Sequence, residues 1–266
     1  IDSGFALPPI HDFEKVITPK TKAIIVCSPN NPTGYLYSRQ EMEDLKTICL
    51  KYNLYLFSDE AYREFCYSGE YVSAMHLSGM DENVVLMDTI SKRYSACGAR
   101  LGALVTKNKA VYDTAMKFAQ ARLSPPGLAQ IMGEAAVDLP ASYFDEPKAE
   151  YIARRDLLVK RLNAMPGVFC PNPGGAFYAM AKLPIDESDK FCQWLLDSFS
   201  YNNKTVMLAP ATGFYGTQGL GRNEVRLAYV LNLNDINEAM DCLEKALEEY
   251  PDRTEVQTME NAGVVI

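Results

Sequence analysis

Three polar segments of the sequence carry residue types that could do chemistry together, and each follows a short apolar run. Residues 30–34 (NNPTG) follow the first run, residues 59–62 (DEAY) the second and residues 88–92 (DTISK) the third. They supply amides, a carboxylate with a phenol, and hydroxyls with a lysine. Taken singly, each is typical of a turn, a helix N-cap or a solvated loop. At the ends of successive strands they indicate one binding site.

The apolar runs predict the strands that would position these segments. We predict a helix that begins after Ser38, because Ser38 and Glu41 have the spacing of a capping box. Strand, crossover helix and strand in this order predict an α/β fold, a mostly parallel sheet with helices on both faces. Ligands of such sheets bind beyond the carboxyl ends of the strands. The strands are expected at residues 23–28, 54–58, 84–87 and 101–106, and Met42, Leu45, Ile48, Cys49 and Tyr52 would share one helix face.

The second half of the chain has a different pattern, which predicts a smaller α+β domain. A long amphipathic helix is expected at about residues 143–165. We place the domain boundary at 139–140, so residues 1–139 form one domain and residues 140–266 the other, with a loose tail from about 251. Beyond the long helix we expect strands at residues 168–170, 176–181, 206–209 and 225–229, and helices near 189–199 and 236–249.

Composition excludes several classes of function. The formal net charge of −8 argues against a nucleic-acid partner, which needs a clustered positive surface. The seven cysteines contain no C-x-x-C pair, which indicates reduced thiols in a cytoplasmic protein and neither a zinc site nor a disulfide framework. With two histidines no metal site is expected, and no apolar run has the roughly 18–20 residues that cross a membrane. Small-molecule chemistry remains.

Four sequence segments resemble the signatures of a known family. SPNNPTG, SDEAY, the T-x-S-K stretch that ends in G-x-R-x-G, and EVRLAY resemble, in order and spacing, segments of the class I and II aminotransferases. These are pyridoxal-phosphate enzymes of fold type I, and aspartate aminotransferase is the member we take as the analogue. The resemblance implies that residues 1–139 are the C-terminal part of the cofactor-binding large domain. We therefore expect that an N-terminal part is missing before Ile1.

The resemblance implies a role for each matching residue. Lys92 would bind the cofactor aldehyde and move the proton of the substrate α-carbon. Asp59 would pair with the pyridine nitrogen, and Asn31 and Tyr62 would contact the ring oxygen. Lys92, Asp59 and Tyr62 are the catalytic candidates, and Asn31 also borders the substrate.

Phosphate and carboxylate groups would be held by other matching residues. Thr89 and Ser91 offer hydroxyls and Arg100 a planar guanidinium for the cofactor phosphate. Arg226, in EVRLAY, would pair with the substrate α-carboxylate in two hydrogen bonds. Arg122 could bind a side-chain carboxylate or form a surface ion pair.

The predicted function is an aminotransferase that moves an amino group between an L-amino acid, aspartate by analogy, and a 2-oxo acid, 2-oxoglutarate by analogy. The resemblance also implies a homodimer, and the 266-residue chain alone is expected to be poorly active. Two alternatives stay open. One is another pyridoxal-phosphate reaction on the same fold, such as C–S β-elimination or decarboxylation. The other is a non-catalytic ligand-sensing domain of a transcription regulator.

Overall fold

The computed structural model describes residues 1–254, and they fall into two compact units. One unit holds residues 5–149 together with 174–176. The other comprises residues 1–4, 150–173 and 177–254. Each unit is described by itself. Most of the tail expected from about residue 251 lies outside the described residues.

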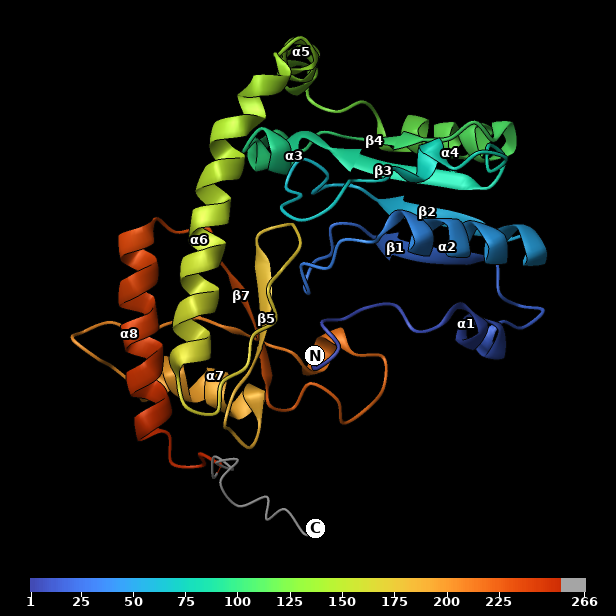
Figure 1. Cartoon of the computed structure of the whole chain (residues 1–266). Helices are drawn as coiled ribbons and strands as arrows, with labels where there is room; N and C mark the ends of the chain where they lie inside the picture. The colour runs from blue at the N-terminus through green and yellow to red at the C-terminus, as the bar shows by residue number, and fades with distance from the viewer. Residues whose placement is uncertain (255–266) are drawn as a thin grey trace. The chain divides into compact units, whose positions relative to one another are not determined.

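The first unit is built on a four-stranded sheet whose strands follow one another in chain order (Figure 1). The first three strands are parallel, and the fourth is antiparallel to the third. Cys27 pairs with Asp59, and Asp59 pairs with Met87, so the first three strands end at nearly the same level. The polar segments predicted from the sequence therefore leave the sheet at one edge, as a mostly parallel α/β fold requires. The strands are β1 (Ala23–Cys27), β2 (Tyr55–Asp59), β3 (Val84–Thr89) and β4 (Gly102–Val105).

Helix α2 (Arg39–Tyr52) covers one face of this sheet. The predicted capping box is confirmed: Ser38 Oγ accepts a hydrogen bond from Glu41 N, and the Glu41 carboxylate accepts one from Ser38 N. The apolar side of the helix packs on β1, β2 and β3, which fixes the crossover. Tyr52 differs from the expectation, because it lies in the last turn and is 36% exposed. The core of this face includes Val26, Met42, Leu45, Ile48, Cys49, Leu56 and Val84.

The opposite face of the sheet carries Ile25, Tyr55 and Phe57, because side chains alternate along a strand. Helix α4 (Lys109–Arg122) lies next to Tyr55 and Phe57 and lines an apolar cavity of about 460 Å³ with them. Ile25 is 74% exposed. This face is therefore less completely covered than the α2 face.

The structure contains short elements that the sequence patterns did not reveal. Ile10 to Val16 form α1, which is absent from the elements predicted above; it has no fully buried residue and hence no strong apolar signal. Strand β3 continues through Asp88 to Thr89, two residues further than expected, because both pair with β4. The remaining elements of this part are η1 (Ala74–His76), α3 (Ile90–Arg93), η2 (Cys97–Ala99), α5 (Gly127–Val137) and η3 (Ala141–Phe144).

The second unit has an antiparallel sheet in the order β5-β7-β6, with helices packed around it. The strand expected at residues 168–170 is wrong: only an isolated bridge joins Phe169 to Lys182. The units divide at residues 149–150, inside α6, and the domain boundary at 139–140 stays a prediction. No helix in the described part of the chain is long and apolar enough to cross a membrane. The elements are α6 (Asp145–Ala164), β5 (Tyr178–Lys182), α7 (Ser188–Asp197), β6 (Ala209–Pro210), η4 (Thr212–Phe214), β7 (Glu224–Ala228) and α8 (Leu233–Glu249).

Candidate active site

The loop after β1 is held rigidly by one of its two asparagines. Asn30 Oδ1 accepts hydrogen bonds from Thr33 N at 3.1 Å and Thr33 Oγ1 at 2.8 Å, and Asn30 O accepts one from Gly34 N at 2.9 Å. Asn30 therefore shapes the turn. The neighbouring Asn31 is half-buried and precedes a cis peptide bond to Pro32. Of the two amides, Asn31 is the one that the sequence analysis predicts as a ligand-binding residue.

The end of β2 supplies a carboxylate and a phenol. Asp59 is half-buried, and its Oδ1 accepts a hydrogen bond from Ala61 N at 3.1 Å. Its carbonyl accepts from Ser28 N at 3.1 Å, which ties the ends of β1 and β2 together. Tyr62, one turn later, is 5% exposed. Two predicted site residues thus occupy one short, well-connected turn.

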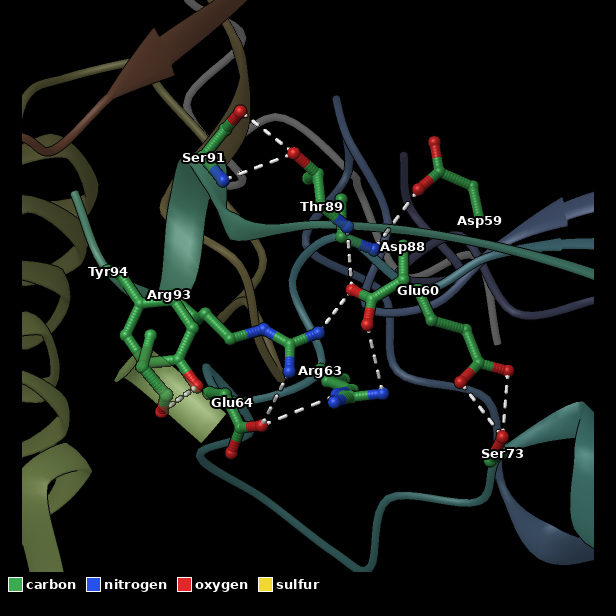
Figure 2. A network of polar contacts seen from close by, with 12 residues as sticks. Asp59, Glu60, Arg63, Glu64, Ser73, Asp88, Thr89, Ser91, Arg93 and Tyr94 are labelled. Carbon is green, nitrogen blue, oxygen red and sulfur yellow. Dashed lines mark hydrogen bonds and ion pairs between the residues drawn. The ribbon is translucent and has the colours of Figure 1, made fainter. Parts of the chain in front are cut away.

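Glu60, which stands between them, is a buried carboxylate that sequence reasoning passed over (Figure 2). Its oxygens accept hydrogen bonds from Ser58 Oγ at 3.0 Å, Ser73 Oγ at 2.9 Å and Ala74 N at 2.9 Å, and also from the Tyr71 hydroxyl. Burial and the negative charge of Glu60 raise the pKa of the Tyr71 phenol above its ordinary value. These contacts join the end of β2 to the segment before η1.

The end of β3 carries the lysine on a four-residue helix. Thr89 is the N-cap of α3, and its Oγ1 accepts a hydrogen bond from Ser91 N at 3.1 Å. The same oxygen lies 2.8 Å from Ser91 Oγ and 3.0 Å from Leu101 O. The two hydroxyls are therefore adjacent, and the helix that begins beside them presents Lys92 in its last turn.

Lys92 lies over the ring of Tyr62, with 5.7 Å between Nζ and the ring centroid. This is within the distance at which an ammonium group interacts with an aromatic face. The contact joins the end of β3 to the end of β2. It brings two of the three catalytic candidates together.

A cavity of about 360 Å³ lies beside the end of β3. Its lining includes all three candidates for phosphate binding, Thr89, Ser91 and Arg100. Arg100 has a left-handed backbone conformation, with φ at 55°, and donates a hydrogen bond to Cys97 O at 3.0 Å. Arg122 lines the same cavity. Its position beside two hydroxyls and a second arginine is one that sequence reasoning did not foresee.

Arg226 belongs to the second unit, whereas the other candidate site residues belong to the first. It lies on β7, opposite Met180 of β5 and Ala209 of β6. Its guanidinium carbon is 4.9 Å from the ring centroid of Tyr178 and 5.2 Å from that of Phe214. Two aromatic faces therefore hold the guanidinium in place.

Comparison with known proteins shows the family of this chain. The family described as aminotransferase class I and II matches residues 9–242. The chain belongs to the class I and II aminotransferases.

Relatives and solved structures of the family match nearly all of the chain. An aspartate aminotransferase of Pyrococcus horikoshii is 32% identical over 246 residues, which are 91% of this chain and 61% of that protein. A putative aminotransferase of Bacillus subtilis is 33% identical, over 90% of this chain and 60% of its own. The solved structure of an alanine aminotransferase from Pyrococcus furiosus superposes with a TM-score of 0.80 at 33% identity, covering 91% of this chain and 61% of that one. The chain thus spans about three fifths of the length of these relatives.

Class I and II aminotransferases depend on pyridoxal phosphate, and the residues of the first unit fit that cofactor. Two hydroxyls and a guanidinium around one cavity are the donors that a phosphate prefers. A lysine beside them has the amine that an aldehyde requires. No group of three or more metal-ligating side chains occurs among residues 1–254.

Several charged residues of the segments that carry Tyr62 and Lys92 were not predicted as site residues. Glu60 directly follows Asp59, Asp88 is the second-last residue of β3, and Arg63, Glu64 and Arg93 continue the same segments. In the sequence these residues are visible only as charged residues near the ends of buried strands. Such a pattern is also typical of a solvated loop, and only the pairing of the strands distinguishes the two.

Proposed function

We propose that this chain carries the lysine-bearing part of a pyridoxal-phosphate-dependent aminotransferase. The observation that carries the proposal is the meeting of two strand ends: Lys92 lies over Tyr62, and Thr89 and Ser91 line the adjacent cavity. Because the chain spans about three fifths of its relatives' length, the activity is proposed for a protein that contains it.

The cofactor, when bound, supplies an electron sink for the negative charge that develops at the substrate α-carbon. Lys92 would take the proton from that carbon and move it between that carbon and the carbon of the cofactor aldehyde. Asp59 would pair with the pyridine nitrogen and keep that nitrogen protonated. A carboxylate is required there because a protonated nitrogen is the stronger electron acceptor.

Other residues bind and orient. Asn31 and Tyr62 would contact the ring oxygen, and Thr89, Ser91 and Arg100 would hold the phosphate. Arg226 binds the α-carboxylate, and the rings of Tyr178 and Phe214 restrict its side chain before the substrate arrives.

The substrates are proposed by likeness alone. Aspartate and 2-oxoglutarate are the pair we propose, and the Pyrococcus horikoshii relative is named an aspartate aminotransferase. Other family members are named for aromatic amino acids or for alanine, so the side-chain preference needs measurement. We propose Arg122 as a ligand of an acidic side chain, the enzyme as a homodimer and the cytoplasm as its location.

The experiment that tests the proposal traps the cofactor on its lysine. The protein is incubated with pyridoxal phosphate, reduced with borohydride and digested, and the labelled residue is identified by mass spectrometry. We expect label at Lys92, its loss in Lys92→Ala and its retention in Lys107→Ala, because Lys107 is an exposed residue paired with Asp81. If the Lys92→Ala variant is still labelled, Lys92 is not the residue that binds the cofactor.

Product analysis separates the reaction classes. The protein is given a panel of amino acids with and without a 2-oxo acid acceptor. An aminotransferase forms a new amino acid only when the acceptor is present. Ammonia and pyruvate released without an acceptor would show a β-elimination, and carbon dioxide a decarboxylation. The same assay on residues 1–266 alone checks the expectation that this chain by itself is poorly active.

A further inference from the structure

Four charged side chains, one of them from the lysine-bearing helix α3, form a closed ring of ion pairs. We define the ion ring as Arg63, Glu64, Asp88 and Arg93. Arg63 Nη1 lies 3.2 Å from Asp88 Oδ2, and Arg63 Nε lies 3.3 Å from Glu64 Oε1. Arg93 contacts Asp88 Oδ1 directly, and its Nη1 lies 3.9 Å from Glu64 Oε1. Positive and negative groups alternate, as Figure 2 shows.

The ring joins the two strand ends that carry the site. Arg63 and Glu64 directly follow Tyr62 in the turn after β2. Asp88 and Arg93 bracket residues 89–92, and Asp88 Oδ1 also accepts a hydrogen bond from Thr89 N at 2.7 Å. Each segment thus contributes one acid and one base, and two of the four ion pairs cross between the segments.

Burial separates this ring from ordinary surface ion pairs. The side chain of Arg93 is 9% exposed and that of Asp88 is 17% exposed. Arg93 Nε is buried and has no hydrogen-bond partner among the described residues. A buried ion pair adds little to the free energy of unfolding, because removing the two charges from water costs about as much as their pairing gains. A buried donor without a partner lowers the stability further. A role in stability alone accounts poorly for Arg93.

We propose that the ion ring is a positioning device that sets where Lys92 lies relative to Tyr62. The proposal rests on the proposed function, in which Lys92 binds the cofactor. Adjacent residues of a helix point about 100° apart, so Arg93 enters the ring while Lys92 extends over Tyr62. When Arg93 is fixed to both strand ends, the helix cannot rotate, and the amine stays beside Tyr62. Arg93 and Glu64 are therefore positioning residues.

The test compares Arg93→Gln, Glu64→Gln and their double variant. Both single changes break the Arg93–Glu64 pair, which is one of the two pairs that cross between the segments, but one change removes a positive charge and the other a negative charge. Positioning predicts that both slow the covalent labelling of Lys92 by pyridoxal phosphate, each by roughly tenfold, and that the double variant is no slower than either single one. A simple charge effect would move the two rates in opposite directions, and that result would overturn the proposal.

A second readout needs no cofactor. Amide hydrogen exchange of residues 89–92 is compared with that of residues 23–27 in the cofactor-free protein. We expect exchange at 89–92 to become roughly tenfold faster in both variants, while 23–27 is unchanged. Exchange that stays within twofold of the wild-type rate in both variants would also overturn the proposal. If the wild-type protein is not labelled at Lys92, the proposed function fails, but this readout still decides on the ring.

Two further variants control the experiment. Arg93→Lys keeps the charge but replaces the two guanidinium nitrogens that contact Asp88 and Glu64 by one ammonium nitrogen on a flexible chain, so we expect the same slow labelling and fast exchange. If Arg93→Lys has the labelling and exchange rates of the wild-type protein, only the charge of Arg93 matters, and the positioning proposal is overturned. Lys107→Gln removes an exposed ion pair with Asp81 in the same unit and should leave both readouts unchanged.

Discussion

Lys92 and Tyr62 lie together, with 5.7 Å between the amine nitrogen and the ring centroid, although 29 residues separate them in the chain. Strand pairing produces this proximity, because β2 and β3 are parallel neighbours that end at the same edge of the sheet. The contact is thus a consequence of topology. It gives the candidate active site its centre.

The hydroxyl of Tyr62 should contribute to cofactor affinity separately from its ring. Tyr62→Phe keeps the ring below Lys92 and removes one donor, so we expect pyridoxal phosphate to bind about fivefold more weakly, about 1 kcal/mol. Labelling at Lys92 should persist. Equilibrium dialysis measures the affinity, and Tyr52→Phe, a change on the outer surface of α2, is the control. Complete loss of labelling in Tyr62→Phe would contradict this separation.

Arg100 should recognise the phosphate of the cofactor. A charge-assisted hydrogen bond contributes about 1.5–3 kcal/mol, so Arg100→Gln should weaken the binding of pyridoxal phosphate more than tenfold. The affinity for pyridoxal, which lacks the phosphate, should change little. An equal loss for both compounds would show that Arg100 acts on the fold instead. Arg39→Gln, which removes an exposed pair with Glu70, is the matched control.

Measurements of cofactor affinity and of the KM for aspartate decide the role of Arg122, which lines the cavity with Thr89, Ser91 and Arg100. If Arg122 binds an acidic substrate side chain, Arg122→Gln should raise the KM for aspartate and leave the affinity for pyridoxal phosphate unchanged. A selective loss of pyridoxal phosphate affinity would instead assign Arg122 to the cofactor phosphate.

The buried carboxylate of Glu60 should stabilise the first unit. Glu60→Gln replaces one acceptor oxygen by an amide nitrogen that faces the donors Ser58, Ser73 and Ala74 N. We expect a loss of about 1–3 kcal/mol in the free energy of unfolding, because a buried donor then faces other donors. Urea denaturation measures it, with the exposed Glu82→Gln as the control. A loss no larger than that of the control would contradict the importance of this network.

The cap of α2 should make stability depend on pH. Burial alone would raise the pKa of Glu41, but hydrogen bonds from Tyr35 and Ser38 outweigh it, and the pKa lies below its model-compound value of 4.5. A carboxylate with a depressed folded-state pKa adds stability above its unfolded pKa. This stability is therefore lost as the pH falls below about 4.5 and through the folded pKa.

Glu41→Gln should remove part of this dependence. The free energy of unfolding of the wild-type protein should fall more steeply between pH 5 and about pH 3 than that of the variant, which has no carboxylate to protonate. The two proteins are compared by urea denaturation at matched ionic strength. Parallel curves would show that the capping box does not contribute. Glu43→Gln, on an outer face of the same helix, is the control.

The parts of the fold that the sequence specified are those with a local signal. The capping box of Ser38 and Glu41 is visible because both partners lie within one turn of helix. The strands β1 to β3 are visible because buried strands read as continuous apolar runs. The strand expected at 168–170 failed because its short apolar run makes only one bridge, and α1 was missed because it has no fully buried residue.

The sequence by itself determined which residues could do the chemistry: a lysine, a carboxylate, a phenol and hydroxyls at three strand ends. Only the tertiary structure decided their neighbours. Strand register places Lys92 over Tyr62, the antiparallel return of β4 brings Arg100 to the cavity that Thr89 and Ser91 line, and the ion ring closes across both segments. The physical reason is that local patterns fix where a strand ends. Pairing between distant segments fixes which ends meet.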